Sequence, residues 1–170
     1  FLDDSSIEVN EEVFHGDYFV LATGQRPTIL PVEGKQYLKT SADFLSLPVL
    51  PKEIIFIGGG YIAFELATIA NAAGSKVTIV HHNQRPLKEF EASLVEEAVH
   101  QMESSGIQFA FDVETQKIIS EGTRYRLVGK ETELVADMIF CATGRQPNTE
   151  SLALEQANVV FDKHGIEVND

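Results

Sequence analysis

One glycine-rich turn limits the fold more than any other feature of this sequence. The three glycines at positions 58–60 follow Glu53–Ile57, a short run with β-branched residues on both faces. Such a run is typical of a parallel strand that is covered on both sides. From Tyr61 onward the apolar residues recur at helical spacing, and Lys76–Val80 then forms a second β-branched run. The sequence therefore predicts a strand, a tight turn, a helix and a second parallel strand.

The turn matches the pattern Gly58-x-Gly60-x-x-Ala63, which between a strand and a helix predicts a dinucleotide-binding turn. The first glycine permits the tight turn, the second lets the backbone approach a pyrophosphate, and the third position packs helix against strand. Free N–H groups and the helix dipole then favour bound phosphates. Gly58, Gly60 and Ala63 are predicted to form the pyrophosphate turn, and Gly59 and Ile62 beside them are also predicted to bind the cofactor.

The residues after the second strand bear on the choice between the two nicotinamide coenzymes. An acidic residue there would accept a hydrogen bond from the ribose 2′-hydroxyl and favour NAD. This chain instead has His81 and His82, followed by Arg85 and Lys88. Cations without a carboxylate suit a 2′-phosphate, so the loop favours NADP. NAD, or a solvated loop without a binding role, remains the alternative.

The rest of the chain extends the same pattern. An amphipathic helix is predicted over Glu91–Ser105, and a further strand over Ile107–Ala110. Three short runs separated by glycines then predict a meander of hairpins, before a buried strand at Asp137–Ala142. We also expect a buried strand at Asp17–Leu21. The predicted fold class is α/β, with a Rossmann-type parallel sheet, flanking helices and a β-meander in place of one crossover.

Composition excludes several classes of function. Thirteen Lys and Arg against 26 Asp and Glu give a net charge of −13, so a nucleic-acid-binding surface is not expected. Cys141 is the sole cysteine, which rules out an intramolecular disulfide and a cysteine-built zinc site, and no metal is expected. Glu65 and Asn71 interrupt the apolar stretch 54–74, so it does not predict a membrane span. Without a signal peptide, a cytoplasmic location is expected.

A short motif occurs twice and brackets the central unit. Ala22–Pro27 has the sequence ATGQRP, and Ala142–Pro147 has the sequence ATGRQP. With the glycine turn in I-x-x-I-G-G-G-Y-I-A-x-E and the late motif D-x-I-x-x-A-T-G-R-x-P-N, this order resembles the FAD-dependent pyridine nucleotide–disulfide oxidoreductases. The absence of an acid after the second strand makes it most similar to the glutathione reductase-like branch.

The resemblance implies roles for residues at matching positions. Tyr61 would cover the nicotinamide pocket beside the flavin, and Glu65 would lie near the carboxamide. Gly144 and Arg145 would belong to the path back toward the FAD domain. The residues that would surround the 2′-phosphate are His81, His82, Arg85 and Lys88. No catalytic residue is expected within the chain, because the family's redox cysteines and catalytic histidine lie outside it.

The same resemblance implies a domain division and a function. Residues 1–48 would connect from an FAD domain, residues 49–142 would bind NAD(P), and residues 143–170 would return. We expect a segment of a longer, homodimeric enzyme that passes hydride from NADPH to FAD and reduces a disulfide such as glutathione disulfide. The alternatives are an NAD(H)-binding domain of a dihydrolipoamide dehydrogenase, mercuric reductase or NAD(P)H oxidase relative, or a non-catalytic nucleotide-sensing module.

Overall fold

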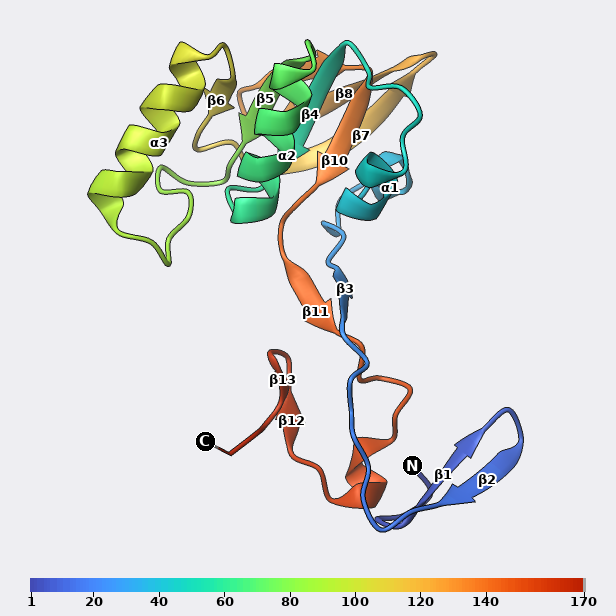
Figure 1. Cartoon of the computed structure of the whole chain (residues 1–170). Helices are drawn as coiled ribbons and strands as arrows, with labels where there is room; N and C mark the ends of the chain where they lie inside the picture. The colour runs from blue at the N-terminus through green and yellow to red at the C-terminus, as the bar shows by residue number, and fades with distance from the viewer. Residues whose placement is uncertain (170) are drawn as a thin grey trace. The chain divides into compact units, whose positions relative to one another are not determined.

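The computed structural model describes residues 1–169 and divides the chain into two compact units (Figure 1). The larger unit is continuous and spans Pro27–Gly144. The smaller unit combines Phe1–Arg26 with the chain from Arg145 onward. The chain therefore passes from one unit to the other twice, at the two places where the ATG motif occurs.

A four-stranded parallel sheet forms the centre of the larger unit. The strands lie in the order β10 (Met138–Cys141), β4 (Glu53–Ile57), β5 (Lys76–Val80) and β6 (Gln108–Ala110). Helix α2 (Tyr61–Ala72) connects β4 to β5, and α3 (Ala92–Ser104) connects β5 to β6. The predicted parallel sheet with flanking helices is confirmed.

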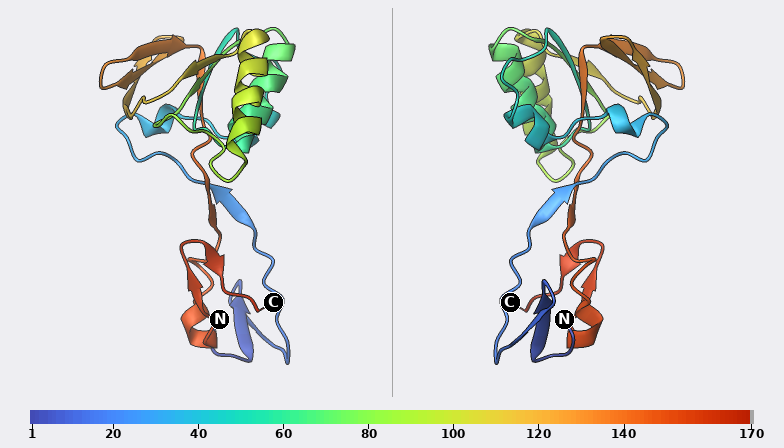
Figure 2. Two further views of the ribbon diagram at one scale, coloured as in Figure 1. Left: turned by 90° about the vertical axis from the view of Figure 1, so that its left-hand side faces the viewer. Right: turned by 90° about the vertical axis from the view of Figure 1, so that its right-hand side faces the viewer.

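Alternation of side chains along β4 explains why both faces of the sheet are covered. Ile54 and Phe56 pack in one core with α2, whereas Ile55 and Ile57 pack in a second core on the opposite face. Successive side chains of a strand point to opposite faces, so an unbroken apolar run supplies both cores. Figure 2 shows the helices and a second sheet on opposite sides of the parallel strands.

The second sheet is the predicted β-meander, which is confirmed. It consists of the antiparallel strands β7 (Thr115–Glu121), β8 (Arg124–Gly129) and β9 (Glu133–Ala136). These strands lie between β6 and β10 in the chain and take the place of a helical crossover. Within residues 1–169, no helix is both long and apolar enough to cross a membrane.

The segment before β4 also belongs to the larger unit. It contains a 3-10 turn (Lys35–Tyr37) and the short helix α1 (Ser41–Leu45). Phe44 packs in the core on the side of α2, and Leu38 packs in the core on the side of the meander. The boundary expected at residue 48 therefore falls inside a compact unit that begins at Pro27.

The smaller unit contains two hairpins, and a further pair of strands lies where the chain passes between the units. These elements are β1 (Ser6–Val9) with β2 (Glu12–His15), β12 (Phe161–Asp162) with β13 (Gly165–Ile166), a 3-10 turn (Leu154–Ala157), and β3 (Gln25–Pro27) with β11 (Arg145–Pro147). The buried strand predicted at Asp17–Leu21 is wrong. Tyr18 is 95% exposed and Val20 is 91% exposed, and no strand among residues 1–169 pairs with this segment.

The two ATG motifs bond through equivalent positions where the chain passes between the units. The Thr28 amide donates to the carbonyl of Gly144, and the Asn148 amide donates to the carbonyl of Gly24, each over 3.0 Å. In both cases the acceptor is the glycine of one motif, and the donor lies four residues after the glycine of the other. The recurrence in the sequence therefore corresponds to a symmetric pairing of the two crossings.

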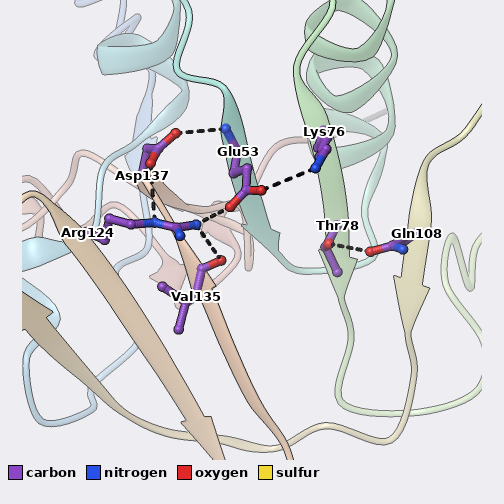
Figure 3. A network of polar contacts seen from close by, with 7 residues as sticks. All are labelled: Glu53, Lys76, Thr78, Gln108, Arg124, Val135 and Asp137. Atoms are coloured by element: carbon purple, nitrogen blue, oxygen red, sulfur yellow. Dashed lines mark hydrogen bonds and ion pairs between the residues drawn. The ribbon is translucent and has the colours of Figure 1, made fainter.

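A polar network joins the meander to the amino-terminal edge of the parallel sheet (Figure 3). The Arg124 guanidinium pairs with the Glu53 carboxylate, lies 3.4 Å from Asp137 Oδ1 and donates to the Val135 carbonyl. Asp137 Oδ2 in turn accepts from the Glu53 amide at 2.9 Å. Lys76 adds a second cation 3.5 Å from Glu53. Arg124 thus connects the start of β8 to β4.

We expect Arg124→Met to destabilise the larger unit by roughly 1–3 kcal/mol, because two half-buried carboxylates lose the cation that both of them contact. Lys76→Met is the matched control, since it removes an exposed cation from the same Glu53 and should change stability by less than about 0.5 kcal/mol. Urea unfolding measures both variants. Equal effects of the two substitutions would contradict the role given to Arg124.

Candidate functional site

Three segments meet at the carboxyl-terminal edge of the parallel sheet, after β4, β5 and β10. The first residue after each strand continues the hydrogen-bond ladder: Gly58 donates to Val80 at 2.8 Å, His81 to Ala110 at 2.9 Å, and Ala142 to Ile57 at 2.7 Å. This ladder brings the glycine turn, the loop after β5 and the second ATG motif to one edge of the sheet.

The connections reverse direction at this edge. From β4 the chain runs through α2 to β5 on one side, and it later returns to β10 on the other side of β4. In open α/β sheets, ligands bind in the crevice outside the carboxyl ends of the strands, at the point where the strand order reverses. The glycine turn lies at this point, because it directly follows β4.

Gly58 lies at a position that only glycine can occupy without strain. Its φ is +125°, a backbone conformation that residues with a side chain rarely adopt. A Cβ atom there would lie 2.3 Å from the carbonyl oxygen of Ala142. Because glycine has no Cβ atom, the turn after β4 can contact the segment after β10.

His81 packs against the glycine turn. A Cβ atom on Gly59 would lie 2.7–2.8 Å from three atoms of the His81 ring, so the ring fills the space beside this glycine. His81 is only 9% exposed, and its Nε2 lies 3.3 Å from the carbonyl oxygen of Arg85. The Leu87 amide also donates to the Gly59 carbonyl at 2.7 Å. The ring and this bond tie the loop after β5 to the turn.

Burial determines the charge of His81. Burial, together with the neighbouring His82, lowers the pKa of the His81 imidazole. Its Nδ1 is buried without a hydrogen-bond partner, so protonation there would leave a charge without compensation. His81 is therefore placed to hold the loop in position as a neutral ring.

Gly60 and Tyr61 form an open helix start. Gly60 is the N-cap of α2 and has no side chain to accept from the first-turn amides, which also lack intrahelical acceptors. No atom lies within 4 Å of where its Cβ would be. Tyr61 is 57% exposed beside it, whereas Ala63 is fully buried against the sheet. Unpaired amides with open space above them fit a bound phosphate.

Most of the remaining predicted residues are exposed, and one is partly buried. On α2, Ile62 packs partly against the core, and Glu65 is exposed. In the loop after β5, His82, Arg85 and Lys88 are all exposed. The structure thus brings these three side chains to the surface of one loop, while His81 faces the glycine turn.

Gly144 and Arg145 take part in the paired crossings, and their place on a return path to an FAD domain stays a prediction. Arg145 Nη2 donates to the carbonyl of Gln25 at 2.5 Å, and Gly144 accepts from Thr28 as described above. Sequence reasoning gave no role to Arg26, which bonds Asn148 Oδ1 at 3.0 Å and pairs with the Glu150 carboxylate. The hydrogen bonds from Arg26 lower the pKa of Glu150 to about 2. The recurring ATG-x-x-P motif was the available signal for this bonding.

Cys141 is buried at the end of β10, and its Sγ donates to the carbonyl of Thr28 at 3.4 Å. It therefore packs as a small core residue. Among residues 1–169, no group of His, Cys, Asp or Glu side chains is arranged to hold a metal ion.

These features define the chain as an α/β protein with a doubly covered parallel sheet and a glycine turn at the point where its strand order reverses. It belongs to the pyridine nucleotide-disulphide oxidoreductase family, whose model matches residues 1–170. Membership of this family implies FAD and a nicotinamide dinucleotide as cofactors, and its members are oxidoreductases.

Individual relatives are similar over most of this chain. It is 33% identical to a mercuric reductase of Staphylococcus aureus over 97% of this chain and 31% of that protein. It is 38% identical to a glutathione reductase of Burkholderia cepacia over 86% of this chain and 33% of that protein. The chain thus spans about a third of the length of these relatives.

A solved structure gives the same picture of the fold. The HOCl-induced flavoprotein disulfide reductase RclA from Escherichia coli superposes with a TM-score of 0.92 at 26% identity. The match covers 100% of this chain and 40% of RclA.

Proposed function

We propose that this chain binds NADP(H) for a flavin-dependent disulfide reductase, which reduces a disulfide such as glutathione disulfide. The observation that carries the proposal is the position of the glycine turn at the reversal of strand order, beside a loop with exposed Arg85 and Lys88. When bound, NADPH supplies a hydride that FAD accepts. The redox cysteines of the enzyme would lie outside this chain.

Each part of the site has a proposed task. The unpaired amides at the start of α2 would bind the pyrophosphate, and Gly58 and Gly60 would let the backbone approach it. Arg85, Lys88 and His82 would bind the 2′-phosphate, with His81 holding their loop. Exposed Tyr61 would cover the nicotinamide, and Glu65, one turn further along α2, would lie near its carboxamide.

The smaller unit is proposed to join an FAD domain of the same full-length chain. Tyr18 and Val20 are apolar residues of this unit that are almost fully exposed within the described residues. Exposed apolar side chains of this kind are typical of an interaction surface. A homodimer and a cytoplasmic location stay predictions.

A second candidate is an NAD(H)-binding or mercuric reductase-like protein. The acidic residues Glu89 and Glu91 border the proposed phosphate loop, and their negative charge opposes the binding of a 2′-phosphate. One relative is a mercuric reductase, and another, a dihydrolipoyl dehydrogenase of Acholeplasma laidlawii, is 28% identical.

We expect the chain to bind NADP⁺ more tightly than NAD⁺, and Arg85→Ala to weaken NADP⁺ binding by roughly tenfold while leaving NAD⁺ within about twofold. The guanidinium contacts a phosphate that only NADP⁺ carries. Calorimetric titration with both coenzymes at matched salt measures this. Arg126→Ala, in the meander, is the control and should change neither affinity.

Three outcomes are informative. Tighter binding of NAD⁺ would favour the second candidate. Equal losses for both coenzymes in Arg85→Ala would contradict the role of Arg85. Binding of neither coenzyme would overturn the proposed function for the isolated chain.

A further inference from the structure

The two cations of the loop after β5 lie beside acidic groups. Lys88 Nζ lies 3.5 Å from Glu89 Oε1. The Arg85 guanidinium donates from Nη2 to the carbonyl of Phe90 at 3.3 Å, which holds it against the peptide that leads into Glu91. Each cation therefore has a carboxylate at or next to its contact.

Glu91 differs from Glu89 because the helix fixes its side chain. Glu91 is the N-cap of α3, and its Oε1 accepts from the Ser93 amide at 3.3 Å and from Ser93 Oγ at 3.2 Å. These bonds, with a smaller contribution from Arg85, lower the pKa of Glu91. Glu91 is thus ionised at neutral pH and cannot turn away without uncapping α3. Glu89 has no such constraint and pairs with Lys88 on the surface.

A third carboxylate borders the same loop from the segment after β6. Gln84 Nε2 donates to Asp112 Oδ2. The formal charges are then +2 for Arg85 and Lys88 and −3 for the carboxylates, a sum of −1. A 2′-phosphate brings further negative charge to this surface, so the carboxylate of Glu91, which α3 fixes next to the peptide that Arg85 contacts, opposes it.

We infer that Glu91 is a specificity-determining residue that weakens binding of the 2′-phosphate and so limits the preference for NADP(H) over NAD(H), which rests on the proposed function. Glu91 acts in two ways. Its charge repels the phosphate, and it competes with the phosphate for Arg85. Neither effect acts on NAD(H), which has a neutral 2′-hydroxyl.

The test removes the charge of Glu91 and keeps the helix cap. Asparagine is a good N-cap, so Glu91→Asn should unfold at the same temperature as the wild type or above it. Calorimetric titration of the 170-residue chain with NADP⁺ and NAD⁺ should show the affinity ratio rising roughly three- to tenfold in favour of NADP⁺. The gain should come from tighter NADP⁺ binding and should shrink at high salt.

Glu97→Gln is the matched control, because it removes one negative charge from the same helix further from Arg85. Its ratio should stay within about twofold of the wild type. An unchanged ratio in Glu91→Asn while both coenzymes still bind, or an equal rise in Glu97→Gln, would overturn the role of Glu91. Failure of the wild type to bind either coenzyme would instead overturn the proposed function, and this inference with it.

Discussion

Replacing Gly58 with alanine is expected to destabilise the larger unit by roughly 3–5 kcal/mol. Two effects add. The backbone has a φ of +125°, which strains any residue with a Cβ atom. The new Cβ would also lie 2.3 Å from the Ala142 carbonyl oxygen and 2.7 Å from its carbon. Both contacts are with backbone atoms of the segment after β10, so β4 and β10 would have to separate.

Gly74→Ala separates the two effects. Gly74 also has a positive φ, +96°, but no atom lies within 4 Å of its Cβ position. It therefore measures the conformational strain alone, about 1–2 kcal/mol. Thermal unfolding should show a melting temperature for Gly58→Ala that is about 6–20 °C below that of the wild type. Equal losses in the two variants would mean that the approach of Gly58 to Ala142 contributes nothing.

The sequence predicts the larger unit well because its signals are local. The run Glu53–Ile57 is apolar at every position after its first residue, and in the structure its alternate side chains supply two separate cores. The helical spacing after Tyr61 and the glycine-separated runs of the meander are equally local. Periodicity of this kind depends only on neighbours in the chain. The fold class therefore followed from the sequence.

The predicted strand at Asp17–Leu21 was wrong because a strand depends on partners that are distant in the sequence. Asp17–Leu21 has the composition of a buried strand, yet Tyr18 and Val20 are exposed because no described strand pairs with the segment. Composition indicates that a segment can form a strand, but a neighbouring strand must supply the hydrogen bonds. The boundary at residue 48 stays a prediction. The compact unit around β4 already includes Leu38 and Phe44, which lie before the two prolines and pack in its cores.

The proposed site was predictable in its positions but not in its orientations. The motif located Gly58, Gly60 and the loop after β5. It could not show that His81 turns its ring onto Gly59, because that contact depends on how β4 and β5 pair. Nor could it show that Glu91 caps α3 beside Arg85. Side-chain direction at the ends of parallel strands is a tertiary property, and it decides which charges a ligand meets.

Gly60→Ala is expected to preserve the fold and to weaken binding of both coenzymes by at least tenfold, about 1.4 kcal/mol. Gly60 has a φ of −91°, which any residue can adopt, and open space around its Cβ position. The free structure therefore gives no reason for glycine at this position. A pyrophosphate bound to the amides of α2 would give such a reason, because a Cβ atom on residue 60 would occupy the path by which the pyrophosphate approaches.

The pattern of losses distinguishes this role from those of Arg85 and Glu91. The pyrophosphate is common to NADP⁺ and NAD⁺, so Gly60→Ala should lower both affinities and leave their ratio within about twofold. Gly60→Ser is the control for helix capping, because serine restores a cap yet still adds a Cβ atom. Titration of both variants, with thermal unfolding in parallel, measures this. Full binding by Gly60→Ser would show that the alanine variant had failed through its helix cap, and the pyrophosphate would then have to lie elsewhere.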